Sequence, residues 1–149
     1  MGNRSYDRCM QLGEAECRTR FAAERVARLG TLGPDGGPHL VPITFALVAD
    51  QLVFAIDHKP KTTPQLARLR NLRRDPRVTV LADHYADDWS TLWWVRIDGL
   101  ATEVTGSERE RAVEELVVRY RQYRETRPDG PVVAVRITRL QGWSASDPG

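Results

Sequence analysis

Cysteine and histidine are scarce in this chain, which has two cysteines and three histidines among 149 residues. Cys9 and Cys17 lack the close spacing of zinc ligands and have no histidine near them, so we interpret both as free thiols. His39, His58 and His84 are widely separated in sequence. We therefore expect no metal site.

Long apolar runs are also lacking. No segment approaches the roughly 20 apolar residues that a membrane helix needs. The first residues, Met-Gly-Asn-Arg-Ser-Tyr, contain neither an apolar signal core nor the myristoylation pattern. We therefore predict a cytoplasmic protein that does not associate with membranes.

A strong excess of charge is missing as well, because the net charge is only +2. That value is too small to indicate a nucleic-acid partner by itself. The arginines between residues 68 and 77 are not interleaved with aromatic residues on which bases could stack. We interpret all of them except Arg68 as solvated helix surface, and expect no nucleic-acid binding.

Familiar catalytic patterns are absent too. The sequence contains no nucleophile paired with a base, no carboxylate dyad and no phosphate-binding P-loop. If the protein is an enzyme, its reactive group is expected to come from a cofactor. We therefore assign no catalytic residue.

What the chain does contain is the composition of one soluble globular domain spanning residues 1–149, with 41% hydrophobic and 28% charged residues. Apolar spacing predicts a helix over 12–28, a second over 64–74, and a third that Ser107 caps. Alternating apolar residues and turn signals predict six strands, the fifth with a bulge at Gly99. The strands are expected at 28–33, 39–49, 52–57, 77–84, 93–105 and 132–140.

Six strands with short turns and no β-α-β alternation predict a mainly β, α+β fold. We expect a six-stranded antiparallel barrel over residues 28–140, with the helices at its periphery. A barrel of this size has little lumen once its own core is packed, so a ligand would bind in an outer groove or between subunits. A dimer is therefore the expected architecture.

The junction between the third predicted strand and the second predicted helix indicates an anion site. Thr63 is a plausible N-cap, and Pro64 lies where proline is tolerated, at the first helical position. A helix N-terminus offers unpaired N–H groups and partial positive charge, which Lys59 and Lys61 would strengthen for a phosphate. A solvated turn with a good cap explains the same residues. Arg68 lies one turn further along.

Pro42 lies within the second predicted strand. Proline cannot donate to a β-ladder, so this strand must lie at a sheet edge or contain a bulge. The consequence is either a simple bend or a stretch of free backbone groups at Val41, Ile43 and Thr44 that could bind a planar ligand.

Three of the four tryptophans, Trp89, Trp93 and Trp94, fall within six residues. Trp93 and Trp94 are consecutive in a predicted strand, so they point to opposite faces and at most one belongs to the core. The other should cover a partner subunit or a bound ring. Arg96 shares the face of Trp94, where it could pair with an acidic group.

Several segments together resemble the split β-barrel flavin and deazaflavin oxidoreductases, a superfamily related to pyridoxamine 5′-phosphate oxidase. The similar segments are Val26-Ala-Arg-Leu-Gly-Thr-Leu32, the turn Pro34-Asp-Gly-Gly-Pro-His39, Val41-Pro-Ile-Thr-Phe45, Arg70-Asn-Leu-Arg-Arg-Asp-Pro-Arg77 and Asp87-Asp-Trp-Ser90. The segment from Asn71 to Arg77 resembles the branch that uses coenzyme F420, a deazaflavin with a phosphate-bearing tail. The resemblance covers roughly residues 22–105 and continues weakly to the last strand.

This resemblance implies a homodimer with two cofactor sites at its interface. It implies an oxidoreductase in which reduced F420 transfers a hydride to a small unsaturated or conjugated substrate. FMN is the alternative cofactor, since both carry a phosphate next to a ribityl chain. Binding of a cofactor or a haem-derived ligand without turnover is a further alternative. The C-terminal segment Arg139-Leu-Gln-Gly-Trp143 lacks the Arg-x-His of the oxidase, which argues against vitamin B6 phosphate oxidation.

The resemblance also implies the cofactor contacts. The ring would lie along the second strand, the phosphate at the start of the second helix, and the tryptophans would come from the partner chain. The implied residues are Val41, Pro42, Ile43, Thr44, His58, Lys59, Lys61, Thr62, Thr63, Arg68, Asn71, Trp89, Trp94 and Arg96.

Overall fold

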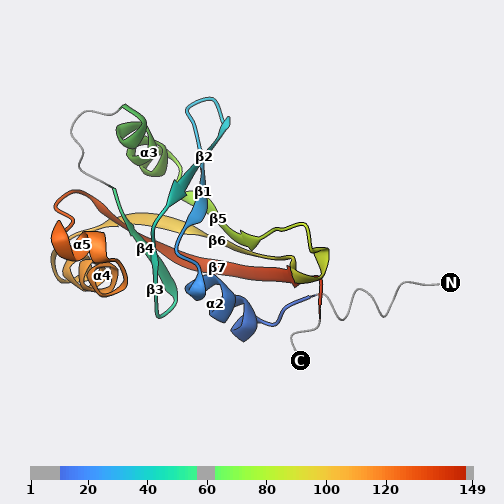
Figure 1. The fold of residues 1–149 in the computed structure, drawn as a ribbon. Coiled ribbons are helices and arrows are strands. Elements are labelled where there is room, and N and C mark those ends of the chain that lie inside the picture. Colours follow the sequence, from blue (N-terminus) through green and yellow to red (C-terminus); the bar gives the residue numbers. More distant parts are fainter. Residues whose placement is uncertain (1–10, 57–62, 147–149) are drawn as a thin grey trace.

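The computed structural model describes residues 11–56 and 63–146, except for the side chains of residues 63–66. Its strands form one seven-stranded antiparallel sheet with helices around it (Figure 1). The strands are β1 (Ala27–Leu32), β2 (Pro38–Ile43), β3 (Ala46–Val48), β4 (Gln51–Ala55), β5 (Arg77–His84), β6 (Trp93–Val104) and β7 (Val132–Ser144). The helices are α2 (Glu14–Ala23), α3 (Thr63–Arg74), α4 (Gly106–Arg119), α5 (Arg121–Glu125) and the 3-10 helix η1 (Trp89–Thr91).

The strand order is β2-β1-β5-β6-β7-β4-β3. Its two edge strands, β2 and β3, are separated along the chain only by residues 44 and 45. The sheet therefore curls until its edges approach each other, which makes a split barrel. The predicted mainly β, antiparallel fold with peripheral helices is confirmed, but the sheet has seven strands rather than six.

The additional strand arises because the predicted strand 39–49 breaks at Thr44 and Phe45 into β2 and β3. The backbone N–H of Phe45 donates to the hydroxyl oxygen of Tyr120 at 3.1 Å, and this hydroxyl also lies 2.9 Å from the Phe45 carbonyl. One side chain thus takes the place of a neighbouring strand. Pro42 lies in β2, an edge strand, as predicted.

Other boundaries differ at the ends of elements. The helix predicted over 12–28 ends at Ala23, because Glu24 turns to an extended conformation and β1 then buries alternate residues from Ala27 onward. The last predicted helix begins at Gly106, so Ser107 lies inside it rather than capping it. The last strand extends beyond 140 to Ser144, and α5 is not predicted by the sequence. The bulge at Gly99 is confirmed by a register shift between Asp98 and Gly99.

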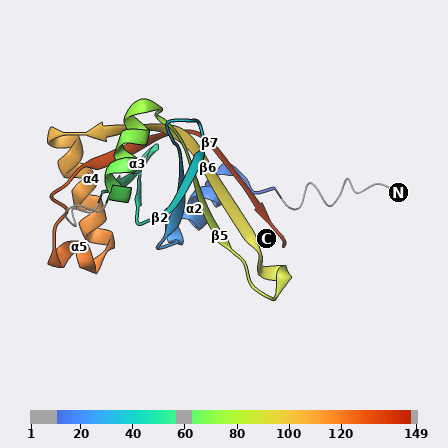
Figure 2. The same ribbon diagram turned by 90° about the horizontal axis from the view of Figure 1, so that it is seen from above.

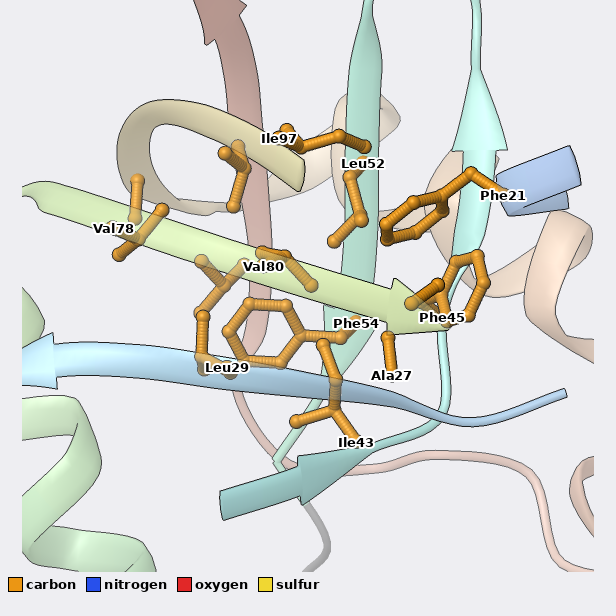
Figure 3. Packing of buried hydrophobic residues seen from close by; sticks show 14 of the residues in the cluster. Phe21, Ala27, Leu29, Ile43, Phe45, Leu52, Phe54, Val78, Val80 and Ile97 are labelled. Carbon is orange, nitrogen blue, oxygen red and sulfur yellow. The ribbon is translucent and has the colours of Figure 1, made fainter. Parts of the chain in front are cut away.

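The core lies inside the curled sheet (Figure 3). The apolar residues of β1, β4, β5 and β6 meet there, and α2 contributes Phe21, whose ring packs edge-on against Phe45 with centroids 5.0 Å apart. Burying an apolar side chain of this size stabilises the fold by about 1.5–3 kcal/mol. A second cluster joins Val113 and Leu116 of α4 to Val53 and Val132, which fixes α4 on the outside of the barrel.

The helices are distributed unevenly around the barrel. In Figure 1, α4 and α5 lie next to each other. Helix α3 lies apart from them, beside β1 and β2. The hairpin of β5 and β6 projects away from α4 and α5, with η1 near its tip (Figure 2). Within the described part of the chain, no helix has the length and apolar character required to cross a bilayer.

Candidate functional site

A groove of about 600 Å³ lies where β2 ends, bordered by side chains from α3, from α5 and from the connection between α2 and β1. It brings together three of the predicted ring contacts and the predicted anion ligand of α3. The lining residues are Arg25, Val26, Pro42, Ile43, Thr44, Ala55, Arg68, Tyr120, Gln122 and Tyr123.

The backbone of Thr44 is available on one side of this groove. Ile43 is the last residue of β2 and pairs with Ala27, whereas β3 begins only at Ala46. None of the hydrogen bonds among the described residues involves the N–H or C=O of Thr44. Its side-chain hydroxyl lies 2.8 Å from the hydroxyl of Tyr123. A ligand edge with an acceptor and a donor can therefore pair with the N–H and the C=O of Thr44.

Arg68 reaches the groove from α3. Its side chain is partly buried, and its Nε has no hydrogen-bond partner among the described residues. Burial lowers the pKa of the Arg68 guanidinium, although an arginine stays charged at any physiological pH. A partly buried cation without a partner is stabilised by an anion, to which it can donate charge-assisted hydrogen bonds.

The described lining residues give the groove positive charge. Arg25 and Arg68 both line it, and none of the described lining residues is acidic. By contrast, other arginines of α3 have partners: Arg73 donates to Glu103 at 2.9 Å, and Arg74 to Asn71 at 3.3 Å. The interpretation of those arginines as surface residues agrees with their exposure. The groove is chemically suited to an anionic ligand.

Asn71 does not line this groove, although it is a predicted phosphate contact. It is 4% exposed, and its amide nitrogen donates to the hydroxyl of Thr31 at 3.3 Å. Its side-chain oxygen, Oδ1, accepts a hydrogen bond from Arg74. In this chain Asn71 therefore joins α3 to β1. Val41, another predicted contact, is partly buried against the core cluster and is not among the lining residues.

The predicted tryptophan contacts lie away from the groove of their own chain. Trp89 is 76% exposed near the tip of the β5–β6 hairpin. Trp94 and Arg96 lie on the outward side of β6, and Trp93 packs against the core, so the predicted division between the two faces is confirmed. Arg96 Nε lies 3.7 Å from Asp98, the acidic partner that the sequence suggests.

The other predicted phosphate ligands, His58, Lys59, Lys61 and Thr62, lie outside the described residues. Thr63 is the first residue of α3, one position before the predicted start of this helix, and its side chain is not described. The start of the helix is therefore close to the prediction, and α3 begins directly after this basic segment.

Sequence reasoning missed the contribution of α5 and of the chain before β1. The sequence analysis names none of Arg25, Tyr120, Gln122 and Tyr123 as site residues. No local pattern marks them, because Tyr120 is an extended residue between α4 and α5 rather than part of a helix. The rings of Tyr120 and Tyr123 pack edge to face at 5.7 Å.

Two other features bear on function. Among residues 11–56 and 63–146, no three His, Cys, Asp or Glu side chains gather as metal ligands would. A second hollow, of about 660 Å³, lies on the outer side of β1, β5 and β6, and none of the predicted site residues lines it. Predicted site residues therefore line the groove beside Arg68, and none of them lines this second hollow.

Comparison with known families agrees with the fold. The sequence model of the family described as pyridoxamine 5′-phosphate oxidase matches residues 14–144. Among curated proteins, none matches the chain.

Solved structures show the same architecture. A conserved hypothetical protein of Mycobacterium tuberculosis has 26% identity and a TM-score of 0.75, with 92% of this chain and 88% of that chain covered. An FAD-binding protein of Mesorhizobium loti has 23% identity and a TM-score of 0.70, with coverages of 91% and 97%. A heme-binding protein of Mycobacterium smegmatis has 22% identity and a TM-score of 0.72, with coverages of 90% and 54%.

Proposed function

Because the chain belongs to the pyridoxamine 5′-phosphate oxidase family, we propose that it is an oxidoreductase that binds a phosphate-bearing flavin or deazaflavin in the groove beside Arg68. Coenzyme F420 is the proposed cofactor, because the segment from Asn71 to Arg77 resembles the branch that uses it. When bound, the reduced cofactor supplies a hydride to a small unsaturated or conjugated molecule. The chain's own residues bind and orient the reactants.

The observation that carries the proposal is that Arg68 Nε finds no hydrogen-bond partner among residues 11–56 and 63–146, in a groove where these ranges contribute no acidic residue. A phosphate placed there would receive charge-assisted hydrogen bonds from Arg68 and would lie close to the N-terminus of α3. Lys59, Lys61, Thr62 and Thr63 are proposed to complete this phosphate site. The partners of Asn71 within the fold favour a supporting role for it rather than direct contact.

The other end of the groove is proposed to hold the ring. Pro42 offers an apolar surface, and the N–H and C=O of Thr44, which have no partner among the described residues, offer one donor and one acceptor. Backbone groups held rigidly near a ring stabilise charge that develops on it, because they need no reorganisation during the reaction.

The proposed assembly is a homodimer in which the partner chain completes each site. Its support is the outward face of the sheet, where Trp94 and Arg96 lie among cross-strand neighbours that include Leu81. Leu40 of β2 lies on the same face of the sheet as Trp94 and Arg96 and is 71% exposed. Apolar and aromatic side chains gathered on one face are typical of interfaces.

Two alternatives follow from specific observations. The FAD-binding protein of Mesorhizobium loti shares the fold, which favours a flavin such as FMN in the same groove. The similarity to the heme-binding protein of Mycobacterium smegmatis supports the second alternative, in which this chain holds a haem-derived ligand without turnover. The positively charged groove suits each of these ligands, since all of them carry anionic groups.

Direct titration separates these alternatives. Purified protein is titrated with F420, FMN and haem, and binding is followed through the quenching of tryptophan fluorescence. The proposal predicts micromolar or tighter binding of F420 and consumption of the reduced cofactor when an unsaturated acceptor is added. If the protein binds FMN but not F420, FMN is the cofactor. If it binds haem tightly and consumes no reduced cofactor, the proposal of an oxidoreductase is overturned.

A further inference from the structure

We propose that Tyr120 is a positioning residue for ligand binding, because its hydroxyl holds the bend that presents Thr44 to the groove. This inference rests on the proposed function, since it concerns the same groove. Tyr120 itself is 6% exposed, and its hydroxyl is committed to protein groups. It therefore acts on a ligand through the backbone that it holds.

The hydroxyl of Tyr120 joins three segments that are distant in sequence. It accepts from the N–H of Phe45 at 3.1 Å and from Nε of Arg119 at 3.2 Å. Its single proton faces two carbonyl oxygens, those of Phe45 and Arg25, each at 2.9 Å. The bend between β2 and β3, the connection before β1 and the end of α4 therefore meet at one oxygen atom.

Arg119 reinforces this junction. Its terminal nitrogen donates to the carbonyl of Glu24, and its guanidinium lies 5.0 Å from the centroid of the Phe45 ring. The guanidinium of Arg25 lies 5.3 Å from the centroid of the Tyr120 ring. These hydrogen bonds and ring contacts link Arg119, Tyr120 and Phe45 and restrain the bend.

The bend has a direct consequence for the groove. Phe45 bonds to Tyr120 instead of to a neighbouring strand, and the N–H and C=O of Thr44 have no hydrogen bond to the described residues. Tyr123 then fixes the Thr44 side chain through the contact between the two hydroxyls at 2.8 Å. The two tyrosines thus hold Thr44 and Phe45 in place while the Thr44 backbone stays available.

Thr44 directly follows the edge strand β2, where N–H and C=O groups that face away from the neighbouring strand are open to a ligand. The N–H and C=O of Thr44 match a ligand edge that carries an acceptor next to a donor. A pyrimidinedione, which flavins and deazaflavins share, has such an edge. Loss of the Tyr120 hydroxyl should therefore loosen recognition of the ring while the phosphate contacts of Arg68 persist.

The test compares Tyr120→Phe with Tyr85→Phe, a matched control at a position that is 63% exposed and outside the groove. Each variant is titrated with FMN and with F420 at a temperature where urea unfolding shows it to be folded. We expect Tyr120→Phe to weaken binding about tenfold or more, since a net hydrogen bond is worth roughly this factor. The visible absorption spectrum of the bound ligand should shift toward that of the free ligand. Tyr85→Phe should match the wild type.

Three outcomes decide the inference. If the wild type binds neither probe, the proposed function fails and the positioning role fails with it. If the wild type binds and Tyr120→Phe gives the same affinity and spectrum while only its stability falls, Tyr120 is purely structural and the inference alone is overturned. If Tyr120→Phe does not fold in plain buffer, the titration is repeated for all variants in a stabilising osmolyte such as sucrose, and unchanged affinity and spectrum of the folded Tyr120→Phe protein would overturn the inference equally.

Discussion

The guanidinium of Arg96 lies over the ring of Trp94, with its Cζ 5.9 Å from the ring centroid. Both residues point outward from β6, and Arg96 also donates to Gln141 at 2.6 Å. Trp93, the neighbour of Trp94, packs against the core and has Arg20 over its ring at 5.7 Å. Adjacent tryptophans in one strand thus have different environments, and of these two only Trp94 lies on the outward face.

Replacing Trp94 with alanine is expected to weaken dimerisation and cofactor affinity together, by about 2 kcal/mol or more for an interface anchor. Sedimentation velocity and cofactor titration on the same sample measure the two effects. Trp93→Ala is the matched control, because it should lower the free energy of unfolding through lost core packing. A wild-type monomer that binds cofactor fully would contradict the shared site.

Replacing Arg68 with glutamine is expected to weaken cofactor binding by about 1.5–3 kcal/mol, the typical value of a hydrogen bond to a charged group. The free energy of unfolding should stay nearly unchanged, since Arg68 Nε has no partner in the part of the chain that the structure describes. Arg70→Gln is the control, because Arg70 is exposed on the same helix and lies outside the groove. Equal affinities of the two variants would place the phosphate elsewhere.

Replacing Lys59 and Lys61 together with alanine is expected to weaken cofactor binding by about 2–4 kcal/mol, because two charge-assisted contacts are lost and do not add fully. Stability should barely change, since a lysine charge contributes little to folding unless it is buried or closely paired. Isothermal titration with cofactor and urea unfolding measure the two quantities. An unchanged dissociation constant in the double variant would exclude this segment as the phosphate site.

The ion pair between Asp75 and Arg77 predicts a pH-dependent contribution to stability. Hydrogen bonds from the side chain and then the backbone of Arg77 lower the pKa of Asp75 from 3.8 to about 2. A carboxylate whose pKa falls on folding stabilises the protein above its unfolded pKa, and this contribution is lost as the pH falls toward the folded value. Asp75→Asn should therefore be less stable than the wild type at neutral pH.

The check is urea unfolding of both proteins at a series of pH values. The difference in unfolding free energy should be constant near neutral pH, shrink as the pH falls from 3.8 toward about 2, and disappear below that range. The difference should be small because the pair is solvent-exposed. A difference that persists unchanged in acid would mean that the Asp75 side chain stabilises the fold by contacts that do not depend on its charge.

Local sequence determined much of the fold. The alternation from Arg77 to His84 predicts β5 at its observed bounds, and α3 begins one residue from its predicted start. Pro42 placed β2 at an edge, and the adjacency of Trp93 and Trp94 divided them between two faces. These features depend on residues a few positions apart, so the chain carries them wherever it folds. The phosphate site at Lys59 and Lys61 stays a prediction, because these residues lie outside the described part of the chain.

Only the tertiary structure decided how the groove is built. Residues 39–49 read as one strand, and the break at Thr44 depends on the hydroxyl of Tyr120, which lies 75 residues from Phe45. Asn71 was predicted to face a phosphate, yet its amide is held by Thr31, 40 residues away. The sequence shows which side chains are polar. Their partners are set only when the curled sheet brings distant segments together, because each buried polar group needs a hydrogen-bond partner among the groups packed around it.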